Sequence, residues 1–241
     1  MMRLSLVIPC YNEARSIPAL AARCAELTAA DAGIEVILVD NGSTDDTPAV
    51  MAAAVAGMSS LRTVRVETNT GYGAGILAGL ASATGDILGW THADLQTDPM
   101  DVLTAFTLFK TADRPERLFV KGLRYGRRFA DVAFTLGMSV FETLLLARPL
   151  RDINAQPNLF ARAFFESWSE APDDFSLDLF VYASAKAAGL KVKRFPVLFA
   201  SRLHGVSSWN VDWAAKRRFI RRTMDFSFRL RRTLATASGR R

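Results

Sequence analysis

Four short apolar segments in the first hundred residues constrain the fold most strongly. They lie at residues 4–9, 34–40, 61–67 and 86–90, and a segment of helical character follows each of them. Residues 34–40, IEVILVD, are almost continuously apolar, which is typical of a strand that is buried on both faces. Because strands that alternate with helices form parallel sheets, the pattern predicts an α/β fold with a Rossmann-like, mainly parallel sheet flanked by helices.

The second half of the chain is less regular. We expect a polar loop over 201–210 and then a basic terminal helix, with no internal repeat or obvious linker. We therefore predict one catalytic domain over 1–210 and a basic amphipathic extension over 211–241. The other elements expected here are strands within 118–128, 151–162 and 191–199, and helices at 129–147 and 174–189.

Composition excludes several classes of protein. Half of the 241 residues are apolar and 22% are charged, as in globular proteins. The two cysteines, Cys10 and Cys24, have neither zinc nor CxxC spacing, so we expect a reduced, cytoplasmic setting. The first residues become polar too early for a signal peptide. The most apolar helix, 129–147, carries Asp131 and Glu142, so no segment qualifies as a membrane span.

The apolar segment at 86–90 ends in a polar cluster, THADLQTDP, at residues 91–99. In this cluster Asp94 and Gln96 offer a carboxylate and an amide oxygen, which are hard ligands of the kind that Mg²⁺ or Mn²⁺ accepts. Ligands of open α/β sheets bind at the carboxyl ends of strands. The cluster therefore predicts a metal site, and a solvated turn that stops a strand with aspartate and proline is the alternative.

Asp40 ends the buried strand at 34–40 in a similar way. Two strand-end acids of one parallel sheet converge on one edge, where Asp40 can accept a hydrogen bond from a base or from a ribose hydroxyl. The alternative role is a helix cap, but Thr44 and Asp45 already provide one for the next helix. We therefore interpret Asp40 as a nucleotide contact.

Residues 69–85 begin with a glycine-rich segment that opens a helix of small residues. Gly73, Gly75 and Ala78 match the GxGxxA pattern of dinucleotide-binding loops. Helix N-termini after glycines bind phosphates through free backbone N–H groups. Two earlier strands already end in polar motifs that a dehydrogenase does not need. We therefore expect this loop near a nucleotide phosphate or a sugar, and we expect no nicotinamide cofactor.

Basic residues recur at positions that we expect to be loops, namely Lys121, Arg124, Arg127, Arg128 and Arg202. A guanidinium group matches a phosphate bidentately, which suits a diphosphate leaving group or an acceptor that bears a phosphate. Solubility is the alternative role for Arg127 and Arg128. Arg202 belongs to RLHGVSSW, whose glycine and serines indicate a mobile loop that can close.

Taken together, seven motifs make the chain resemble the family 2 glycosyltransferases, which have a GT-A fold. The likeness is closer to the dolichol-phosphate mannosyltransferase and polyprenyl-phosphate glycosyltransferase branch. Each motif is weak alone, but the ordered set is specific and extends over residues 4–210. The motifs are VIPCYNE (7–13), VDNGSTDDT (39–47), NTGYGAGILAG (69–79), TGDILGWTHADLQTDP (84–99), KGLRYGRR (121–128), DINAQPNLF (152–160) and RLHGVSS (202–208).

The resemblance implies a nucleotide-sugar donor and a divalent ion, Mg²⁺ or Mn²⁺. It implies that Asp94 and Gln96 hold the metal ion. It also implies that Arg124 and Arg202 meet a phosphate of the donor or the acceptor. The nucleotide contacts that it implies are Pro9, Tyr11, Glu13, Asp40, Asn69 and Gly71.

The chain departs from the branch in two ways. The branch usually has DADLQ, and here the first aspartate is His92, which lowers the negative charge at the metal; the second aspartate and the glutamine remain, so we still expect a metal site. The pair of C-terminal membrane helices found in many relatives is missing. An Arg-rich amphipathic helix at the C-terminus would instead lie on anionic lipid, with a solvated helix as the alternative. Helix 129–147 would add apolar surface near the acceptor, although we expect most of it to be core.

These features predict an inverting, metal-dependent transfer of a sugar from a UDP- or GDP-linked donor to a polyprenyl phosphate. The enzyme would be peripheral at the cytoplasmic face of the membrane, and the metal and Arg202 would neutralise the leaving diphosphate. An acceptor phosphate is mostly ionised at pH 7 and needs little general base. A hydroxyl acceptor needs one, and Asp152 is the candidate.

Two alternative functions are open at this point. One is a family 2 transferase that adds a sugar to a glycan hydroxyl in the synthesis of cell-surface polysaccharide. The other is a non-catalytic, basic module that binds membranes. Nucleic acid is not an expected partner, because the basic tail lacks the context of a recognition helix or a stacking sheet. The sequence leaves the sugar, the base and the oligomeric state open.

Overall fold

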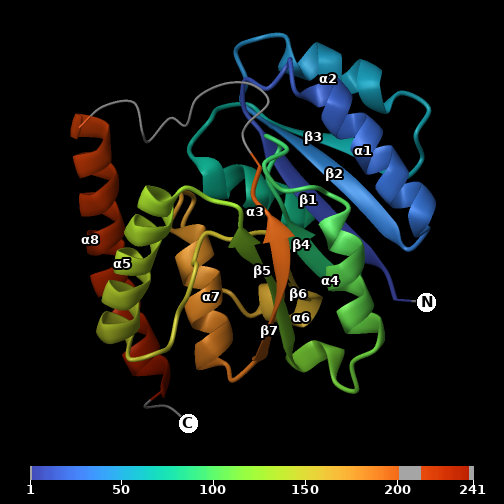
Figure 1. The fold of residues 1–241 in the computed structure, drawn as a ribbon. Coiled ribbons are helices and arrows are strands. Elements are labelled where there is room, and N and C mark those ends of the chain that lie inside the picture. The colour runs from blue at the N-terminus through green and yellow to red at the C-terminus, as the bar shows by residue number, and fades with distance from the viewer. Residues whose placement is uncertain (1, 201–212, 239–241) are drawn as a thin grey trace.

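The computed structural model describes residues 2–200 and 213–238. Within these residues the centre is a seven-stranded sheet in the order β3-β2-β1-β4-β6-β5-β7 (Figure 1). The strands are β1 (Leu4–Cys10), β2 (Ile34–Asn41), β3 (Leu61–Val66), β4 (Ile87–Trp90), β5 (Leu118–Tyr125), β6 (Asn158–Ala161) and β7 (Lys191–Leu198).

The sheet is parallel except at β6, which runs antiparallel to both β4 and β5. Strand β1 pairs in parallel with β2 and β4, β2 pairs with β3, and β5 pairs with β7. The prediction of a mainly parallel α/β sheet is therefore confirmed, and the reversal of β6 is what the hydrophobic pattern did not reveal. The carboxyl ends of the parallel strands and the segment before β6 meet at one edge, toward which the β7 arrow points in Figure 1. This edge is called the carboxyl edge below.

Helices cover both faces of the sheet (Figure 1). One face carries α1 (Ile17–Ala30), α2 (Thr47–Val55) and α4 (Asp101–Lys110), and the other carries α3 (Tyr72–Ser82), α6 (Arg162–Glu166) and α7 (Leu177–Ala187). A 3₁₀ turn (Pro115–Arg117) precedes β5. Helices α5 (Phe129–Leu146) and α8 (Trp213–Ser238) pack against each other at the margin. The short helix α6 was not predicted.

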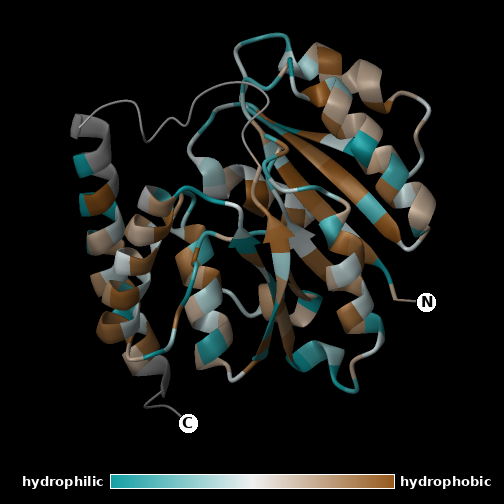
Figure 2. Cartoon of the chain, in the orientation of Figure 1, coloured by the Kyte–Doolittle hydropathy of each residue, from teal (hydrophilic) through white to brown (hydrophobic). Residues whose placement is uncertain are grey.

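Each face of the sheet has its own hydrophobic core. Alternate residues of a strand point to opposite faces. Accordingly, Leu6 and Ile8 of β1 join the core beneath α1 and α4, whereas Val7 joins the core beneath α3 and α7. Figure 2 shows the resulting concentration of apolar residues in the strands. Because the strands are covered on both sides, their polar ends gather at the carboxyl edge.

Helix α5 corrects one expectation. Most of it was expected to be core, but Phe129 is 87% exposed, Leu144 is 77% exposed and Leu136 is 58% exposed. The contact with α8 is partly polar, because Ser227 Oγ donates to Glu142 Oε1 at 2.6 Å. Burial raises the pKa of Glu142 to about 7, although the hydrogen bond from Ser227 opposes this shift. The helix therefore presents an apolar surface beside α8.

Candidate functional site

The loops after β1 and β2 are tied together by hydrogen bonds. Asn12 N–H donates to Ser43 Oγ at 3.0 Å, and Asn12 Oδ1 accepts from the backbone N–H of Thr44 at 2.9 Å. Glu13 N–H donates to Thr47 Oγ1 at 2.8 Å. These bonds join the first two motifs into one surface at the carboxyl edge.

Asp40 lies at the end of β2 and is 3% exposed. Its Oδ1 accepts the N–H of Ser43 at 2.9 Å, and its Oδ2 lies 3.4 Å from Arg65 Nη1. The ion pair with Arg65 lacks hydrogen-bond geometry, so among the described residues the buried Oδ2 accepts no hydrogen bond. A buried acceptor without a donor is costly, so such an atom is suited to receive a hydrogen bond from a ligand. Asp40 thus orders a turn and presents an acceptor. The N-cap of α2 is Asp46, without a side-chain capping hydrogen bond, so neither Thr44 nor Asp45 caps this helix as expected. Asp45 Oδ1 accepts the N–H of Thr47, the first residue of α2, at 3.0 Å.

The glycine-rich loop, residues 69–73, packs against the segment before α7. A Cβ added at Gly71 would lie 2.4 Å from Asp173 O, and one at Gly73 would lie 2.6 Å from Pro172 O. Ala74 N–H, near the start of α3, donates to Asp173 O at 2.8 Å. The glycines therefore let two backbones approach closely, a reason that the sequence did not reveal. This helix N-terminus uses at least one of its amides within the protein.

Asp94 and Gln96 leave β4 in a tight turn. Leu95 between them adopts a φ of 55°, and Gln96 N–H donates to Asp94 Oδ1 at 3.1 Å. Gln96 Nε2 donates to Ala200 O at 3.1 Å, and Gln96 O accepts the N–H of Ala200 at 2.8 Å. The residues after β7 therefore hold this turn in place. Asp94 is 7% exposed.

The donor set at the end of β4 bears on the metal prediction. Within residues 2–200 and 213–238, no group of three or more His, Cys, Asp or Glu side chains is placed to hold a metal ion. Mg²⁺ usually takes one or two carboxylates together with substrate phosphates rather than a complete protein cage. Asp94 and Gln96 fit such a shared site. His92 contributes no carboxylate, and its ring lies 5.7 Å from that of Tyr72.

A cluster of arginines surrounds Asp152 at the carboxyl edge. Asp152 Oδ1 accepts from Arg124 Nε at 3.0 Å and also from Arg124 Nη2, and Oδ2 accepts the backbone N–H of Arg124 at 3.1 Å. Arg127 Nη2 lies 3.5 Å from Asp152 Oδ1, and Arg194 Nη2 lies 3.7 Å from Asp152 Oδ2. All four side chains are at most 16% exposed. These four residues are called the arginine cluster below.

The arginine cluster carries a surplus of positive charge. Three guanidinium groups against one carboxylate leave a net charge of +2. Arg127 Nε is buried, and no described residue accepts a hydrogen bond from it. Burial and the neighbouring charge of Arg124 lower the pKa of Arg127. Uncompensated buried charge is unfavourable, so the cluster is suited to receive an anion.

The surroundings of Asp152 bear on its predicted role as the general base for a hydroxyl acceptor. Burial alone would raise the pKa of Asp152, but hydrogen bonds and charge from Arg124, together with the charge of Arg127, hold it below its ordinary value. A carboxylate whose oxygens are engaged in this way is a weak base. In this structure Asp152 is the counter-ion of the arginine cluster, and its role in catalysis stays a prediction.

Lys121 also differs from its expected place in a basic loop. It lies within β5 and is fully buried, and its Nζ donates to Ala155 O and, at 2.7 Å, to Asn158 Oδ1. Asn158 Nδ2 donates in turn to Asp178 Oδ1 at 3.0 Å. Burial lowers the pKa of Lys121 and raises that of Asp178, and each charge opposes the shift of the other. This buried network ties β5, β6 and α7 together beneath the segment that carries Asp152.

Sequence reasoning missed Asp178, Asn158 and the pair of Gln156 and Tyr72. Gln156 Nε2 donates to Tyr72 Oη, which links the segment before β6 to the start of α3. The one signal for Asp178 was an acid within LDLFVYA (177–183), an otherwise apolar stretch of a predicted helix.

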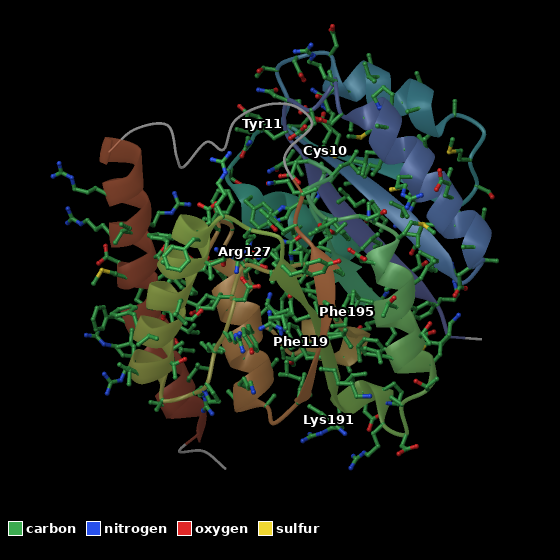
Figure 3. The ribbon with its side chains drawn as sticks, viewed as in Figure 1. Cys10, Tyr11, Phe119, Arg127, Lys191 and Phe195 are labelled. Atoms are coloured by element: carbon green, nitrogen blue, oxygen red, sulfur yellow. The ribbon has the colours of Figure 1, made fainter. Side chains whose placement is uncertain are left out.

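Three further residues predicted to contact the nucleotide lie in β1 or in loops that follow strands. Pro9 is in β1, Tyr11 follows β1 and is 47% exposed, and Asn69 is exposed in the glycine-rich loop. Figure 3 labels Tyr11 and Arg127 toward the carboxyl edge and Lys191 at the opposite end of the molecule. Arg202 lies outside the described residues, so its predicted role stays a prediction.

The fold is shared with solved glycosyltransferase structures. The structure is similar to glucosyl-3-phosphoglycerate synthase from Mycobacterium tuberculosis in complex with Mn²⁺, UDP and glucosyl-3-phosphoglycerate. The TM-score is 0.69 at 21% identity, over 91% of this chain and 77% of that one. The complex of the same synthase with Mg²⁺ and UDP gives a TM-score of 0.65 at 20% identity, over 85% of this chain and 73% of that one. The predicted GT-A fold is therefore confirmed.

A family model, glycosyl transferase family 2, matches residues 5–167. The chain belongs to this family, as the ordered motifs predicted. Its curated relatives include an undecaprenyl-phosphate 4-deoxy-4-formamido-L-arabinose transferase from Sodalis glossinidius, which is 42% identical over 105 residues. That alignment covers 42% of this chain and 31% of the relative. A transferase of the same name from Yersinia pestis is 37% identical over 105 residues, which is 42% of this chain and 31% of the relative. The matched segment thus spans about a third of these relatives.

The buried network generates a test of stability. We expect Lys121→Met to destabilise the protein by about 3–5 kcal/mol, because it leaves the buried carboxylate of Asp178 without its counter-charge. Adding Asp178→Asn to that variant should restore part of the loss. Urea unfolding followed by circular dichroism measures both variants. A stability of Lys121→Met equal to that of the unmodified protein would contradict the account of the network.

Proposed function

We propose that this protein transfers a sugar from a nucleotide diphosphate to a polyprenyl phosphate. The observation that carries the proposal is the arginine cluster, with its net charge of +2 and its low exposure. It lies at the same sheet edge as Asp40 and Asp94. An acceptor that brings a phosphate would offset the surplus charge. The names of the undecaprenyl-phosphate transferases among the relatives support this class of acceptor.

The donor nucleotide would bind over the ends of β1 and β2. The buried Oδ2 of Asp40 would accept a hydrogen bond from the base or the ribose. The other proposed contacts come from the loops that the Asn12 hydrogen bonds hold together and from the glycine-rich loop. UDP is the first nucleotide to test, because the similar solved structures hold UDP. The proposed contacts are Pro9, Tyr11, Glu13, Asn69 and Gly71.

Asp94 and Gln96 would hold Mg²⁺ or Mn²⁺ together with the donor diphosphate. When bound, the ion supplies positive charge that stabilises the leaving group. The protein prepares this site through the turn at Leu95 and through the hydrogen bonds of Gln96 with Ala200. Arg202 would add a second positive charge to the leaving diphosphate.

The acceptor phosphate would bind at Arg124 and Arg127. Guanidinium groups bind phosphate bidentately, and a phosphate monoester with a second pKa of about 6 is already largely ionised at pH 7. An acceptor oxygen attacks C1 of the sugar with inversion while the bond from C1 to the β-phosphate oxygen breaks, and the nucleoside diphosphate leaves. This step requires no proton transfer to a base. The occupied carboxylate of Asp152 therefore favours a phosphate acceptor over a glycan hydroxyl.

A transfer assay tests the proposal. The protein, Mn²⁺, undecaprenyl phosphate in detergent and a panel of UDP-sugars should yield a lipid-linked sugar, detected by mass spectrometry, together with free UDP. We expect Asp94→Asn to lower the rate at least about 100-fold, because charge stabilisation by a bound ion amounts to several kcal/mol. Asp101→Asn, in the first turn of α4, is the matched control and should leave the rate within about twofold.

Two results would contradict the proposal. One is transfer to a glycan hydroxyl with no transfer to the lipid phosphate, which would favour the glycan-extending alternative. The other is an Asp94→Asn variant that is as active as the unmodified protein, which would remove the metal assignment.

We also propose peripheral contact with the cytoplasmic face of an anionic membrane, through α5 and α8. In the described part of the chain, no helix is long and apolar enough to cross a bilayer. Ile220, Met224 and Phe228 of α8 recur at four-residue spacing and are 39–45% exposed, beside the exposed apolar side chains of α5. Exposed arginines flank this stripe at 217, 221, 222, 229, 231 and 232. Apolar surface with surrounding arginines is typical of helices that lie in the membrane interface.

Flotation with lipid vesicles tests this contact. We expect binding to vesicles that contain phosphatidylglycerol and weaker binding to pure phosphatidylcholine, because the arginines attract anionic lipid by about 1 kcal/mol each. The double variant Phe129→Ser, Leu144→Ser should weaken binding further by removing exposed apolar area. Equal binding of the double variant and the unmodified protein would show that α5 does not meet the membrane.

A further inference from the structure

An ion pair connects helix α8 to the segment before α7, which contacts the glycine-rich loop of the proposed donor site. Arg222 Nε lies 2.6 Å from Asp174 Oδ2, and the Asp174 side chain is 16% exposed. The other oxygen of this carboxylate, Oδ1, accepts the N–H of Ser176 at 2.7 Å, just before α7 begins. Arg222 therefore holds a carboxylate that is built into the segment before α7.

The residues beside Asp174 support the glycine-rich loop. Asp173 O accepts the N–H of Ala74 at 2.8 Å and packs directly on Gly71. On the other side of Asp174, the ring of Phe175 stacks on that of Tyr72, with centroids 4.8 Å apart and planes 9° apart. The segment 172–175 is thus the wall against which the loop at 69–73 is placed.

The loop is fixed on its far side to the end of β2. Asn41 Nδ2 donates to Gly71 O at 2.8 Å, and Asn41 directly follows Asp40. Contacts therefore run without a break from α8, through 172–175 and the glycine-rich loop, to the residue proposed to hold the nucleotide. A change in α8 can reach the donor site along this path.

We propose that Arg222 is a positioning residue for donor binding. Its ion pair keeps the segment 172–175 against the glycine-rich loop and so holds Asn69 and Gly71 in the positions proposed to bind the nucleotide. This inference rests on the proposed donor site. Arg222 is not among the proposed donor, metal or acceptor contacts, and its side chain is 61% exposed. Helix α8 also keeps its anchors at Phe226, Ser227 and Leu230, which are buried. Loss of the ion pair therefore loosens the loop without undocking the helix.

Arg222→Gln tests this role through donor affinity. We expect the KM for the nucleotide sugar, and the Kd of the nucleotide with Mn²⁺ measured by calorimetry, to rise together about twofold to fivefold, the range that an exposed ion pair supports. The kcat should stay within about twofold, because no reacting group changes. Arg222→Lys keeps the charge and should restore most of the affinity.

Asp225→Asn is the control on the same helix. Asp225 is 62% exposed and pairs only loosely with Arg221, at 4.0 Å within α8. This variant should leave KM and Kd unchanged. Phe175→Leu is a second variant that interrupts the same path at the ring stack on Tyr72, and it should raise KM without any change in α8.

The outcomes separate this inference from the proposed function. An unmodified protein that binds no nucleotide overturns both. If the unmodified protein binds nucleotide but Arg222→Gln leaves KM and Kd unchanged, or if Asp225→Asn has the same effect as Arg222→Gln, the positioning role is wrong and the donor site stands. A fall in kcat with an unchanged KM also overturns it, because positioning of the donor acts through affinity.

Discussion

The reversal of β6 is the constraint on which the rest of the site depends. Because β6 runs against β4 and β5, the segment that precedes it arrives at the carboxyl edge rather than at the opposite end of the sheet. That segment brings Asp152 to Arg124, near the end of β5, and to Arg194, in the middle of the neighbouring strand β7. Beneath it, the network through Lys121 fixes the backbone. A parallel strand at this position would separate the acid from its arginines.

The sequence predicted the strands, most helices and the strand-end acids well, because each depends on local pattern. A run such as IEVILVD indicates a buried strand wherever it lies, and parallel topology then gathers Asp40 and Asp94 at one edge. What failed depended on contacts between distant segments. The sequence predicts that Lys121 is a basic residue of a loop. Only the fold shows that its Nζ is buried and donates to Asn158 and to the carbonyl of Ala155. Similarly, composition alone does not show that Phe129, Leu136 and Leu144 of α5 are exposed among the described residues.

The charges around Asp152 distinguish transfer to a phosphate from transfer to a hydroxyl, which the fold alone does not. A transferase that acts on a hydroxyl needs a carboxylate with a free oxygen and an ordinary or raised pKa. Here Asp152, the first residue of the DINAQPNLF motif, is neutralised by guanidinium groups, and its pKa is lowered. The same contacts leave excess positive charge for an anion, so one cluster both weakens the base and favours a phosphate acceptor. At the proposed metal site, His92 stands where the branch that the sequence resembles usually has an aspartate, so the charge there would shift in the same positive direction.

Calorimetric titration of the unmodified protein with UDP and with GDP, each in Mn²⁺ and in chelator, tests whether the carboxyl edge binds a nucleotide together with a metal ion. We expect one nucleotide to bind, its binding to require the metal, and Asp40→Asn to weaken it because the buried acceptor oxygen is lost. Binding of neither nucleotide, or equal binding in Mn²⁺ and in chelator, would contradict a metal-dependent nucleotide-sugar site at the carboxyl edge.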